Sequence, residues 1–159
     1  MGDKRRFDKF AEYIANCFPK TTRVADVAGG EGYLQQALRE CGFEYVMTFD
    51  KRKGRRDRPR MRYQYRFFSS DVNEDFDLLV GMHPDEATDL IIVEAARRDI
   101  PFVIVPCCVR PSATVYWGRY AYWDWMTYLK QLAVNKGFIL TEFMLRIGGK
   151  NLGLKGDRR

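Results

Sequence analysis

A glycine-rich turn near the amino end restricts the possible folds of this chain more than any other feature. The turn, residues 28–32 (AGGEG), follows the short β-prone run 23–27 and precedes a helical pattern over residues 33–41. A strand, a glycine turn and a helix in this order are typical of a βαβ unit, in which the backbone of the turn comes close to a ligand. The sequence therefore predicts an α/β fold with a ligand site at this turn.

The rest of the chain continues the alternation of helices and strands. Apolar residues at helical spacing predict helices over residues 7–18, 33–41, 88–98 and 117–134. Apolar and β-branched runs predict strands over residues 23–27, 45–49, 63–68, 76–80, 101–105 and, as the last strand, 138–147. We expect residues 1–159 to form a single domain with a mostly parallel sheet, whose ligand binds beyond the carboxyl ends of the strands.

Composition and cysteine spacing exclude several classes of protein. The apolar share of 46% is too high for a disordered chain, and no apolar run reaches the roughly 18 residues of a membrane span. The first residues lack the apolar stretch of a signal peptide, so we expect a cytoplasmic protein that does not contact a membrane. The four cysteines form no CxxC pair, which argues against a metal site, and we expect Cys17 and Cys41 to be buried free thiols.

The positive charge of the chain is concentrated in one segment. The net charge is +6, and residues 51–66 hold nine lysines and arginines against a single acid. Aromatic residues stand at positions 63, 65, 67 and 68, and such side chains stack on unpaired bases while the basic ones neutralise phosphates. The segment predicts a nucleic-acid contact, with RNA favoured; the alternatives are a solvated loop and aromatic packing in the core. The candidate substrate-binding residues here are Lys51, Arg52, Arg55 and Arg56.

The predicted helix 117–134 carries a cluster of aromatic side chains near its start. Tyr116, Tyr120 and Trp123 share one helical face, which we expect to pack against the sheet. Tyr122 and Trp125 then lie on the opposite side of the helix, where they form a stacking surface or an interface.

Two common nucleotide-binding loops do not fit the glycine turn. A dinucleotide fingerprint needs a third glycine where this chain has Gln35, and a phosphate loop needs a Gly-Lys-Ser/Thr run, which is missing. Residues 26–32 (DVAGGEG) instead resemble the first motif of class I S-adenosylmethionine-dependent methyltransferases, with Ala28 in the place of the first glycine. The resemblance implies a Rossmann-like class I methyltransferase fold, in which helices cover both faces of the sheet and the last strand is antiparallel.

The same resemblance implies S-adenosylmethionine as the cofactor. Asp50, after the second predicted strand, matches the acid that binds both ribose hydroxyls, and a carboxylate can accept both of these hydrogen bonds. Asp71 falls where the family places an adenine contact, although its surroundings are equally typical of an ordinary turn. The methyl group of Ala28 is tolerable if φ is negative there. The candidate cofactor-binding residues are Asp26, Ala28, Gly29, Gly30, Gly32, Asp50, Asp71 and Gly81.

Two motifs in the second half of the chain narrow the resemblance. Residues 80–90 (VGMHPDEATDL) and the Pro-Cys-Cys run at 106–108 are similar to paired signatures of the tRNA acceptor-stem ribose 2′-O-methyltransferases and related methyltransferase-like domains. The chain departs from the tRNA enzymes at Pro84 and Asp85, where they carry Cys-Gly, and after Cys108, where they continue with histidine. The resemblance therefore implies the fold and the cofactor and leaves the substrate open.

His83 is the candidate catalytic residue, because its turn follows the fourth strand, where this fold presents groups to the methyl acceptor. An imidazole there orients or deprotonates a hydroxyl or a ring nitrogen; the alternative is a histidine that bonds to the turn and shapes the pocket. Asp85 is expected to cap the helix that follows. Pro106 and Cys107 are expected to bind substrate as a pocket wall, the alternative being a cysteine nucleophile toward a pyrimidine ring.

These features together predict an S-adenosylmethionine-dependent methyltransferase that acts on tRNA or another structured RNA, with a possible protein partner for substrate recognition. Two alternatives stay open. One is a methyltransferase-like adaptor that binds RNA or protein without catalysis, which Ala28 and the missing second histidine favour. The other is an enzyme that acts on a small molecule, which leaves the basic segment without a function.

Overall fold

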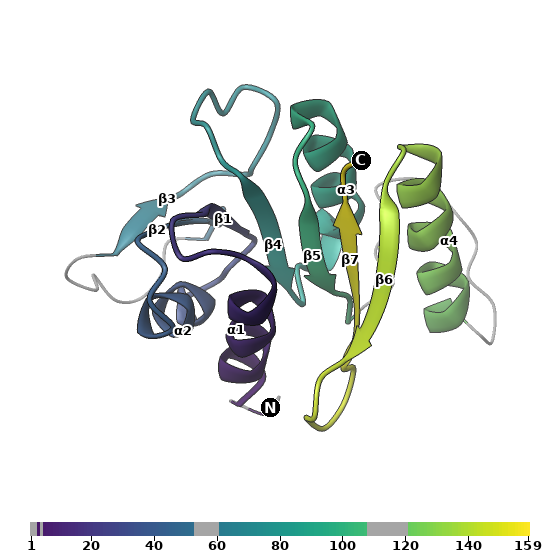
Figure 1. Cartoon of the computed structure of the whole chain (residues 1–159), viewed down its shortest axis with the longest axis horizontal. Helices are drawn as coiled ribbons and strands as arrows, with labels where there is room; N and C mark the ends of the chain where they lie inside the picture. Colours follow the sequence, from purple (N-terminus) through teal and green to yellow (C-terminus); the bar gives the residue numbers. More distant parts are fainter. Residues whose placement is uncertain (1–2, 4, 53–60, 108–120) are drawn as a thin grey trace.

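The strands in the described part of the chain form one seven-stranded sheet in the order β3-β2-β1-β4-β5-β7-β6 (Figure 1). The structure is a computed structural model and describes residue 3 and residues 5–52, 61–107 and 121–159. The strands are β1 (Arg23–Val27), β2 (Tyr45–Phe49), β3 (Arg62–Gln64), β4 (Leu78–Met82), β5 (Phe102–Val105), β6 (Ile139–Met144) and β7 (Leu152–Asp157). The helices are α1 (Arg5–Cys17), α2 (Tyr33–Glu40), the short 3-10 helix η1 (Asp85–Ala87), α3 (Thr88–Arg98) and α4 (Ala121–Asn135).

The sheet is parallel except at its last strand. β1 lies between β2 and β4 and is parallel to both, and the parallel pairing continues from β2 to β3 and from β4 to β5. β7 runs antiparallel to both of its neighbours, β5 and β6. Every residue of β4 and β5 is buried, as expected for parallel strands covered on both faces. The predicted mostly parallel sheet with an antiparallel last strand is confirmed.

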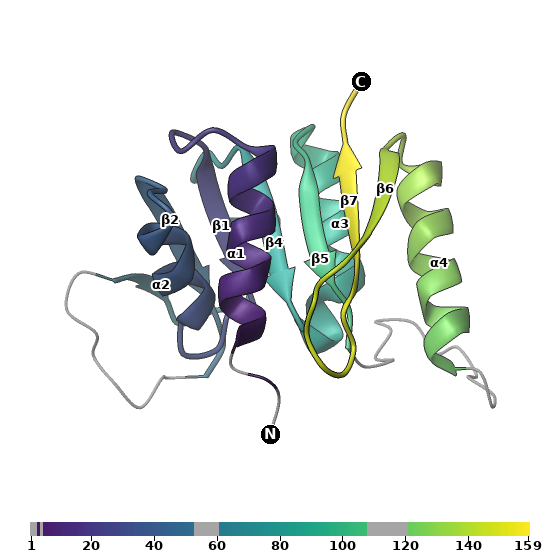
Figure 2. The ribbon, with the colours of Figure 1, turned by 60° about the horizontal axis from the view of Figure 1, so that its bottom comes forward.

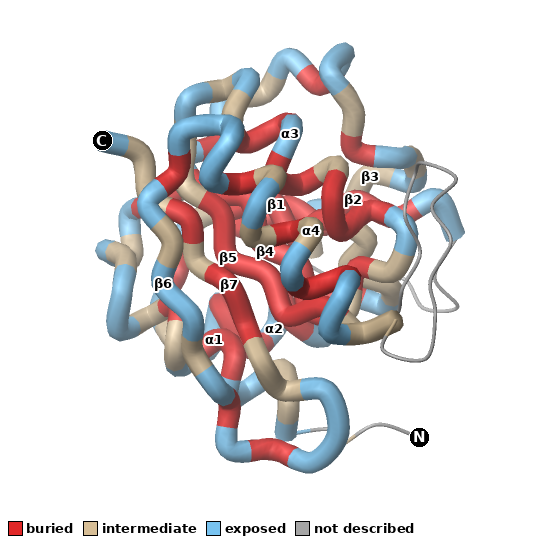
Figure 3. Tube along the Cα trace, turned by 90° about the vertical axis from the view of Figure 1, so that its right-hand side faces the viewer, coloured by how far each residue is buried: buried red, intermediate tan, exposed pale blue. Residues whose placement is uncertain are grey.

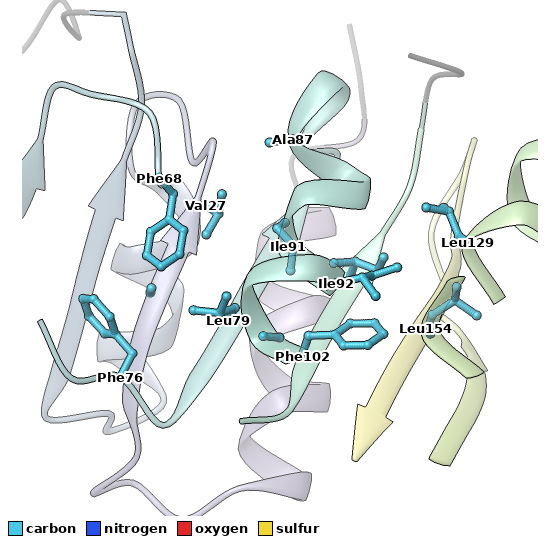
Figure 4. Close-up of a cluster of buried hydrophobic side chains, with 14 of the residues drawn as sticks. Val27, Phe68, Phe76, Leu79, Ala87, Ile91, Ile92, Phe102, Leu129 and Leu154 are labelled. Carbon is cyan, nitrogen blue, oxygen red and sulfur yellow. The ribbon is translucent and has the colours of Figure 1, made fainter. Parts of the chain in front are cut away.

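Helices cover both faces of this sheet. Figure 2 shows α1 and α2 in front of the sheet and α3 behind it. One apolar core lies under α1 and α2 and includes Phe10 and Leu38. The other lies under α3 and α4 and includes Ile91 and Leu129 (Figure 4). Because both faces are occupied, a ligand approaches the sheet at the ends of its strands.

Four predicted strands differ from the observed ones, of which β5 differs only in starting one residue later, at Phe102. β3 covers Arg62–Gln64 at the edge of the sheet instead of residues 63–68. β4 starts two residues later than predicted, because Phe76 packs in the core and the Asp77 carboxylate accepts a hydrogen bond from the Arg23 N–H at 2.8 Å. The prediction of 138–147 as the last strand was wrong, since this run contains β6 and β7 follows it.

The glycines of β7 explain why the pattern did not predict this strand, since glycine is depleted in strands. A Cβ on Gly153 would lie 2.1 Å from Cζ of Phe143, and one on Gly156 would lie 2.2 Å from Cε1 of Phe102. Aromatic rings of the neighbouring strands therefore lie directly over bare backbone at both positions. The neighbours supply the apolar surface that the residues of β7 lack.

The aromatic faces of α4 are opposite to the predicted ones. Trp125 is fully buried, whereas Trp123 is 60% exposed. The sheet-facing stripe continues through Leu129 and Ala133, four and eight residues after Trp125, and this spacing sets the buried face. Figure 3 shows that the neighbouring edge strand β6 is largely exposed. The remaining aromatic residues of this prediction, Tyr116 and Tyr120, lie outside the described residues.

Candidate functional site

The carboxyl ends of the parallel strands bring the predicted site residues to one edge of the sheet. Val27 pairs with Phe49, and the N–H of Gly29 donates to the Phe49 carbonyl at 3.2 Å. The N–H of Gly30 then donates to Oδ2 of Asp50 at 2.8 Å. The glycine turn and the acid after β2 are therefore in direct contact.

A cavity of about 230 Å³ opens at this edge. Four of the predicted site residues line it, namely Ala28, Asp50, Lys51 and Arg52. The rest of the lining comes from the ends of β1 and β2, the segment after β3, and the region from η1 to α3: Val27, Phe49, Arg66, Phe67, Phe68, Pro84, Asp85, Glu86, Ala87 and Leu90. A few charged groups among apolar walls are typical of a site for a small organic ligand.

The aromatic residues beside the basic segment were predicted either to pack in the core or to be available for stacking, and Phe68 and Phe67 differ in this respect. Phe68 is 2% exposed and packs edge-on against Phe49, with ring centroids 4.9 Å apart. Phe67 is 57% exposed, and Nζ of Lys51 lies 5.0 Å from its ring centroid. Sequence reasoning missed Leu90 as a lining residue, because an apolar residue in a helical pattern usually belongs to the core.

Asp50 is held by a complete set of hydrogen bonds. Its Oδ1 accepts from the N–H of Arg52 at 2.9 Å and from Nε of the same arginine at 3.1 Å. Its Oδ2 accepts from Gly30 and from Nη2 of Arg52 at 3.2 Å. Burial raises the pKa of Asp50, but the bonds from Arg52 and Gly30 outweigh this effect, so the pKa lies below its ordinary value. The carboxylate is charged and uses two acceptor positions for the Arg52 guanidinium.

Asp26 lies behind the glycine turn and is fully buried. The Thr48 hydroxyl donates to its Oδ2 at 2.9 Å, and Nε2 of Gln35 donates to that hydroxyl at 2.8 Å. Among the described residues Oδ1 has no hydrogen-bond partner. A Cβ on Gly29 would lie 2.1 Å from Oδ2, so this glycine lets the turn pass over the carboxylate. Burial, strengthened by the charge of Asp50, raises the pKa of Asp26 to about 7.

The backbone of Ala28 does not have the negative φ that the prediction required for an alanine at this position. Its φ is 55°, in the left-handed region, instead of negative. A non-glycine residue there is strained by roughly 1 kcal/mol or more. Gly30 and Gly32 also have positive φ, 57° and 78°, and a Cβ on Gly32 would lie 2.3 Å from Cε of Met61. The turn therefore follows a path that suits glycine, and Ala28 follows it at an energetic cost.

A second group of polar residues lies where β4 and β5 end. His83 is half-buried, its Nε2 lies 2.9 Å from the Lys150 carbonyl, and it does not line the cavity. Burial lowers the pKa of His83, an effect that the Lys150 carbonyl opposes. Asp85 lines the cavity, and its Oδ1 accepts a hydrogen bond from the Cys107 thiol at 3.3 Å. Burial, with Cys107 nearby, raises the pKa of Tyr122.

The other candidate cofactor-binding residues lie beside the cavity. Asp71 is exposed, and its carboxylate pairs with Nη2 of Arg66 at 2.5 Å, so it contacts the lining through that arginine. Gly81 is buried in β4, where a Cβ would lie 2.6 Å from Cδ1 of Ile91. The bare backbone of Gly81 therefore allows α3 to pack closely on the strand.

The candidate substrate-binding residues have different surroundings. Lys51 is exposed, and its Nζ pairs with Oε1 of Glu86 at 2.8 Å. Pro106 is buried at the end of β5 and, like Cys107, does not line the cavity. Two of the predicted residues, Arg55 and Arg56, lie outside the described residues.

Solved structures of known proteins share the architecture of this chain. It superposes on the ribosomal protein L11 methylase of Lactobacillus delbrueckii subsp. bulgaricus with a TM-score of 0.68 and 17% identity, covering 96% of this chain and 77% of that one. It also superposes on CalO1, a methyltransferase in calicheamicin biosynthesis in its S-adenosylhomocysteine-bound form, with a TM-score of 0.60 and 20% identity, covering 98% of this chain and 54% of that one. The chain has the class I methyltransferase fold.

A sequence comparison adds one curated relative. The probable tRNA (uracil-O(2)-)-methyltransferase of Drosophila melanogaster is 28% identical in an alignment of length 152, which covers 87% of this chain and 29% of that protein. This chain therefore spans less than a third of the length of that relative. No family profile matches the chain.

In the described part of the chain, no group of histidine, cysteine or acidic side chains is arranged to hold a metal ion. None of the helices in that part is long and apolar enough to span a bilayer. Of the two cysteines expected to be buried, Cys17 is exposed and Cys41 is half-buried.

Proposed function

We propose that the chain binds S-adenosylmethionine at the cavity beside the glycine turn and transfers its methyl group to RNA. The contact between Gly30 and Asp50 carries the proposal, because it joins a charged carboxylate to the backbone of the turn at the wall of an apolar cavity. The two ribose hydroxyls of a nucleoside can both donate to such a carboxylate. The cofactor supplies an electrophilic methyl group, and the protein binds it and orients the acceptor toward it.

The residues at this site fit the proposed cofactor. Two acceptor positions of Asp50, one on each oxygen, are used by the Arg52 guanidinium, and a diol requires two. A Cβ on Gly30 would meet only the mobile end of Arg52, at 3.8 Å, so the turn leaves room for a ligand. Phe67 and Leu90 offer apolar surface to a base.

RNA is the proposed acceptor for two independent reasons. The Drosophila melanogaster relative is named as a probable tRNA methyltransferase. Residues 51–66 hold nine basic side chains, of which Lys51, Arg52 and Arg66 line the cavity. Phosphates near the acceptor nucleotide would therefore meet positive charge beside the cofactor. Contact of His83 with the acceptor, the cofactor roles of Asp71 and Gly81, and a protein partner for recognition stay predictions.

Calorimetry with S-adenosylhomocysteine tests the cofactor site. We expect the parent protein to bind and Asp50→Asn to bind about 100-fold more weakly, because a neutral amide cannot accept both diol hydrogen bonds. Asp124→Asn changes an exposed acid of α4 and is expected to bind like the parent. Binding that is absent in the parent, or unchanged in Asp50→Asn, would contradict the proposed site.

Transfer of tritiated methyl groups from S-adenosylmethionine to unmodified tRNA transcripts tests the acceptor. We expect label in the RNA with the parent protein and background label with Asp50→Asn. Binding of cofactor and RNA without transfer would favour the adaptor alternative instead. Binding of cofactor without measurable RNA binding would favour a small-molecule acceptor.

A further inference from the structure

We infer that Asp85 is the carboxylate that faces the methyl acceptor and takes its proton, an inference that rests on the proposed function. Asp85 lines the same cavity as Asp50, and it does so from the start of η1, which follows β4. Its Oδ1 accepts a hydrogen bond from Cys107, which follows β5, at 3.3 Å. The Asp85 carboxylate therefore contacts both the proposed cofactor cavity and Cys107, and the segments after β4 and β5 that hold these two residues are the ones predicted to contact the acceptor.

The backbone on both sides of Pro84 adopts a conformation that is uncommon for residues other than glycine. His83 has a φ of 53° and Asp85 a φ of 48°, so two non-glycine residues on either side of Pro84 are left-handed. Such conformations persist where the surroundings impose them, and they cluster at functional sites. The expected capping role is wrong, because neither η1 nor α3 has a side-chain cap. The Asp85 side chain bonds to Cys107 instead.

The other acids at the cavity are less suited to this role. Asp50 already accepts four hydrogen bonds. Glu86 pairs with the ammonium group of Lys51 at 2.8 Å. The carboxylate of Asp85 accepts its hydrogen bond from a thiol, which is a weak donor, so it retains most of its capacity to accept. His83 lies against the Lys150 carbonyl and outside the lining.

With Asp85 as the base, the methyl-transfer step has a group that accepts the acceptor's proton. An O–H or N–H group of the acceptor donates to the free oxygen of Asp85, which holds the acceptor atom in place. The acceptor atom then forms a bond to the methyl carbon while the carbon–sulfur bond breaks, and the electron pair of that bond goes to sulfur. The acceptor's proton passes to the Asp85 carboxylate, which later releases it to water. Cys107 keeps its proton throughout and orients the carboxylate.

A binding measurement that needs no RNA tests the position of this charge. In sinefungin, an analogue of the cofactor, a carbon bearing a protonated amine replaces the sulfonium and its methyl group. We expect the parent protein to bind sinefungin about tenfold more tightly than S-adenosylhomocysteine by calorimetry, because the amine donates to Asp85. Asp85→Asn is expected to bring the ratio of the two affinities close to one while S-adenosylhomocysteine still binds. Asparagine tolerates the left-handed backbone well, so this variant is expected to fold.

Two further variants distinguish the effect of Asp85 on the ratio of the two affinities from the effects of its neighbours. Glu86→Gln removes the adjacent acid and His83→Gln removes the predicted catalytic imidazole; both are expected to keep the parent ratio. A ratio that Asp85→Asn leaves unchanged, or that His83→Gln abolishes, would overturn the inference while leaving the cofactor site intact. If neither compound binds the parent protein, the proposed function fails and the inference fails with it.

Discussion

The buried carboxylate of Asp26 makes the stability of the protein depend on pH in a way that one substitution removes. Burial, with the added charge of Asp50, raises its pKa from 3.8 to about 7, and the hydrogen bond from Thr48 offsets only part of that rise. The unfolded chain has the ordinary pKa. Between these two values the folded protein therefore keeps a proton that the unfolded chain has lost.

The linkage relation gives the sign and size of this effect. Below about pH 4 both states carry the proton, and Asp26 adds no pH dependence. From about pH 4 to about pH 7 the free energy of unfolding falls by about 1.4 kcal/mol per pH unit, because the folded state binds more protons than the unfolded state. The total loss is about 4 kcal/mol, of which about 3 kcal/mol falls between about pH 5 and about pH 8.5.

Asp26→Asn removes the ionisation and keeps an oxygen for the Thr48 hydroxyl. Relative to the parent, we expect its free energy of unfolding to rise by about 3 kcal/mol over that pH range, on top of a constant cost for the buried amide. Urea unfolding followed by tryptophan fluorescence measures this, and subtraction cancels the groups that both proteins share. Asp124→Asn is the control, with a difference from the parent that is independent of pH. A parent-to-variant difference for Asp26→Asn that stays constant within about 0.5 kcal/mol would refute the raised pKa.

Three more predictions follow from the turn, the cavity and the basic segment. Ala28→Gly is expected to raise the free energy of unfolding by about 1 kcal/mol in urea titrations, because glycine adopts the observed φ of 55° without strain; a destabilised variant would contradict this. Arg52→Gln frees two acceptor positions on Asp50 and is expected to tighten S-adenosylhomocysteine binding about threefold to fivefold in calorimetry, whereas weaker binding would show that Arg52 contacts the ligand. RNA binding is expected to weaken steeply with salt. In filter-binding titrations, neutralising Arg55, Arg56 and Arg58 together is expected to lower the magnitude of the slope of log affinity against log salt concentration by about 2 to 3. An unchanged slope would contradict this prediction.

The sequence predicted the elements of the fold where local pattern and tertiary packing agree. β1, β2 and α3 have the predicted bounds, because their apolar residues follow one period and polar or glycine residues end them. β7 breaks this rule, since the apolar surface at Gly153 comes from the ring of Phe143 on another strand. The buried face of α4 was misassigned for a related reason, because the stripe is set by residues further along the helix than the aromatic cluster. In both cases the deciding contact is remote in sequence.

The candidate site was predictable to the extent that parallel strands place their carboxyl ends together. That rule joined the glycine turn to Asp50, and the two are in contact. It also brought residues 81–85 to this edge of the sheet. It did not predict which side chain of that segment enters the cavity: Asp85 lines it, whereas His83 lies against the Lys150 carbonyl. It also did not predict Leu90, whose apolar side chain has the same pattern in a core and in a pocket wall.

Ala28 stands where the motif has its first glycine, and this difference raises the question of whether the site only binds the cofactor or also catalyses methyl transfer. An alanine that altered the turn would displace the backbone donors on either side of it. The structure shows the opposite: Ala28 adopts the left-handed φ of a glycine, and Gly29 and Gly30 keep their bonds to Phe49 and Asp50. The methyl group therefore costs roughly 1 kcal/mol of stability, and the hydrogen bonds of Gly29 and Gly30 are present alongside it. For this reason Ala28 does not favour the adaptor alternative. The choice between adaptor and enzyme depends instead on the residues that face the acceptor, among which we infer Asp85.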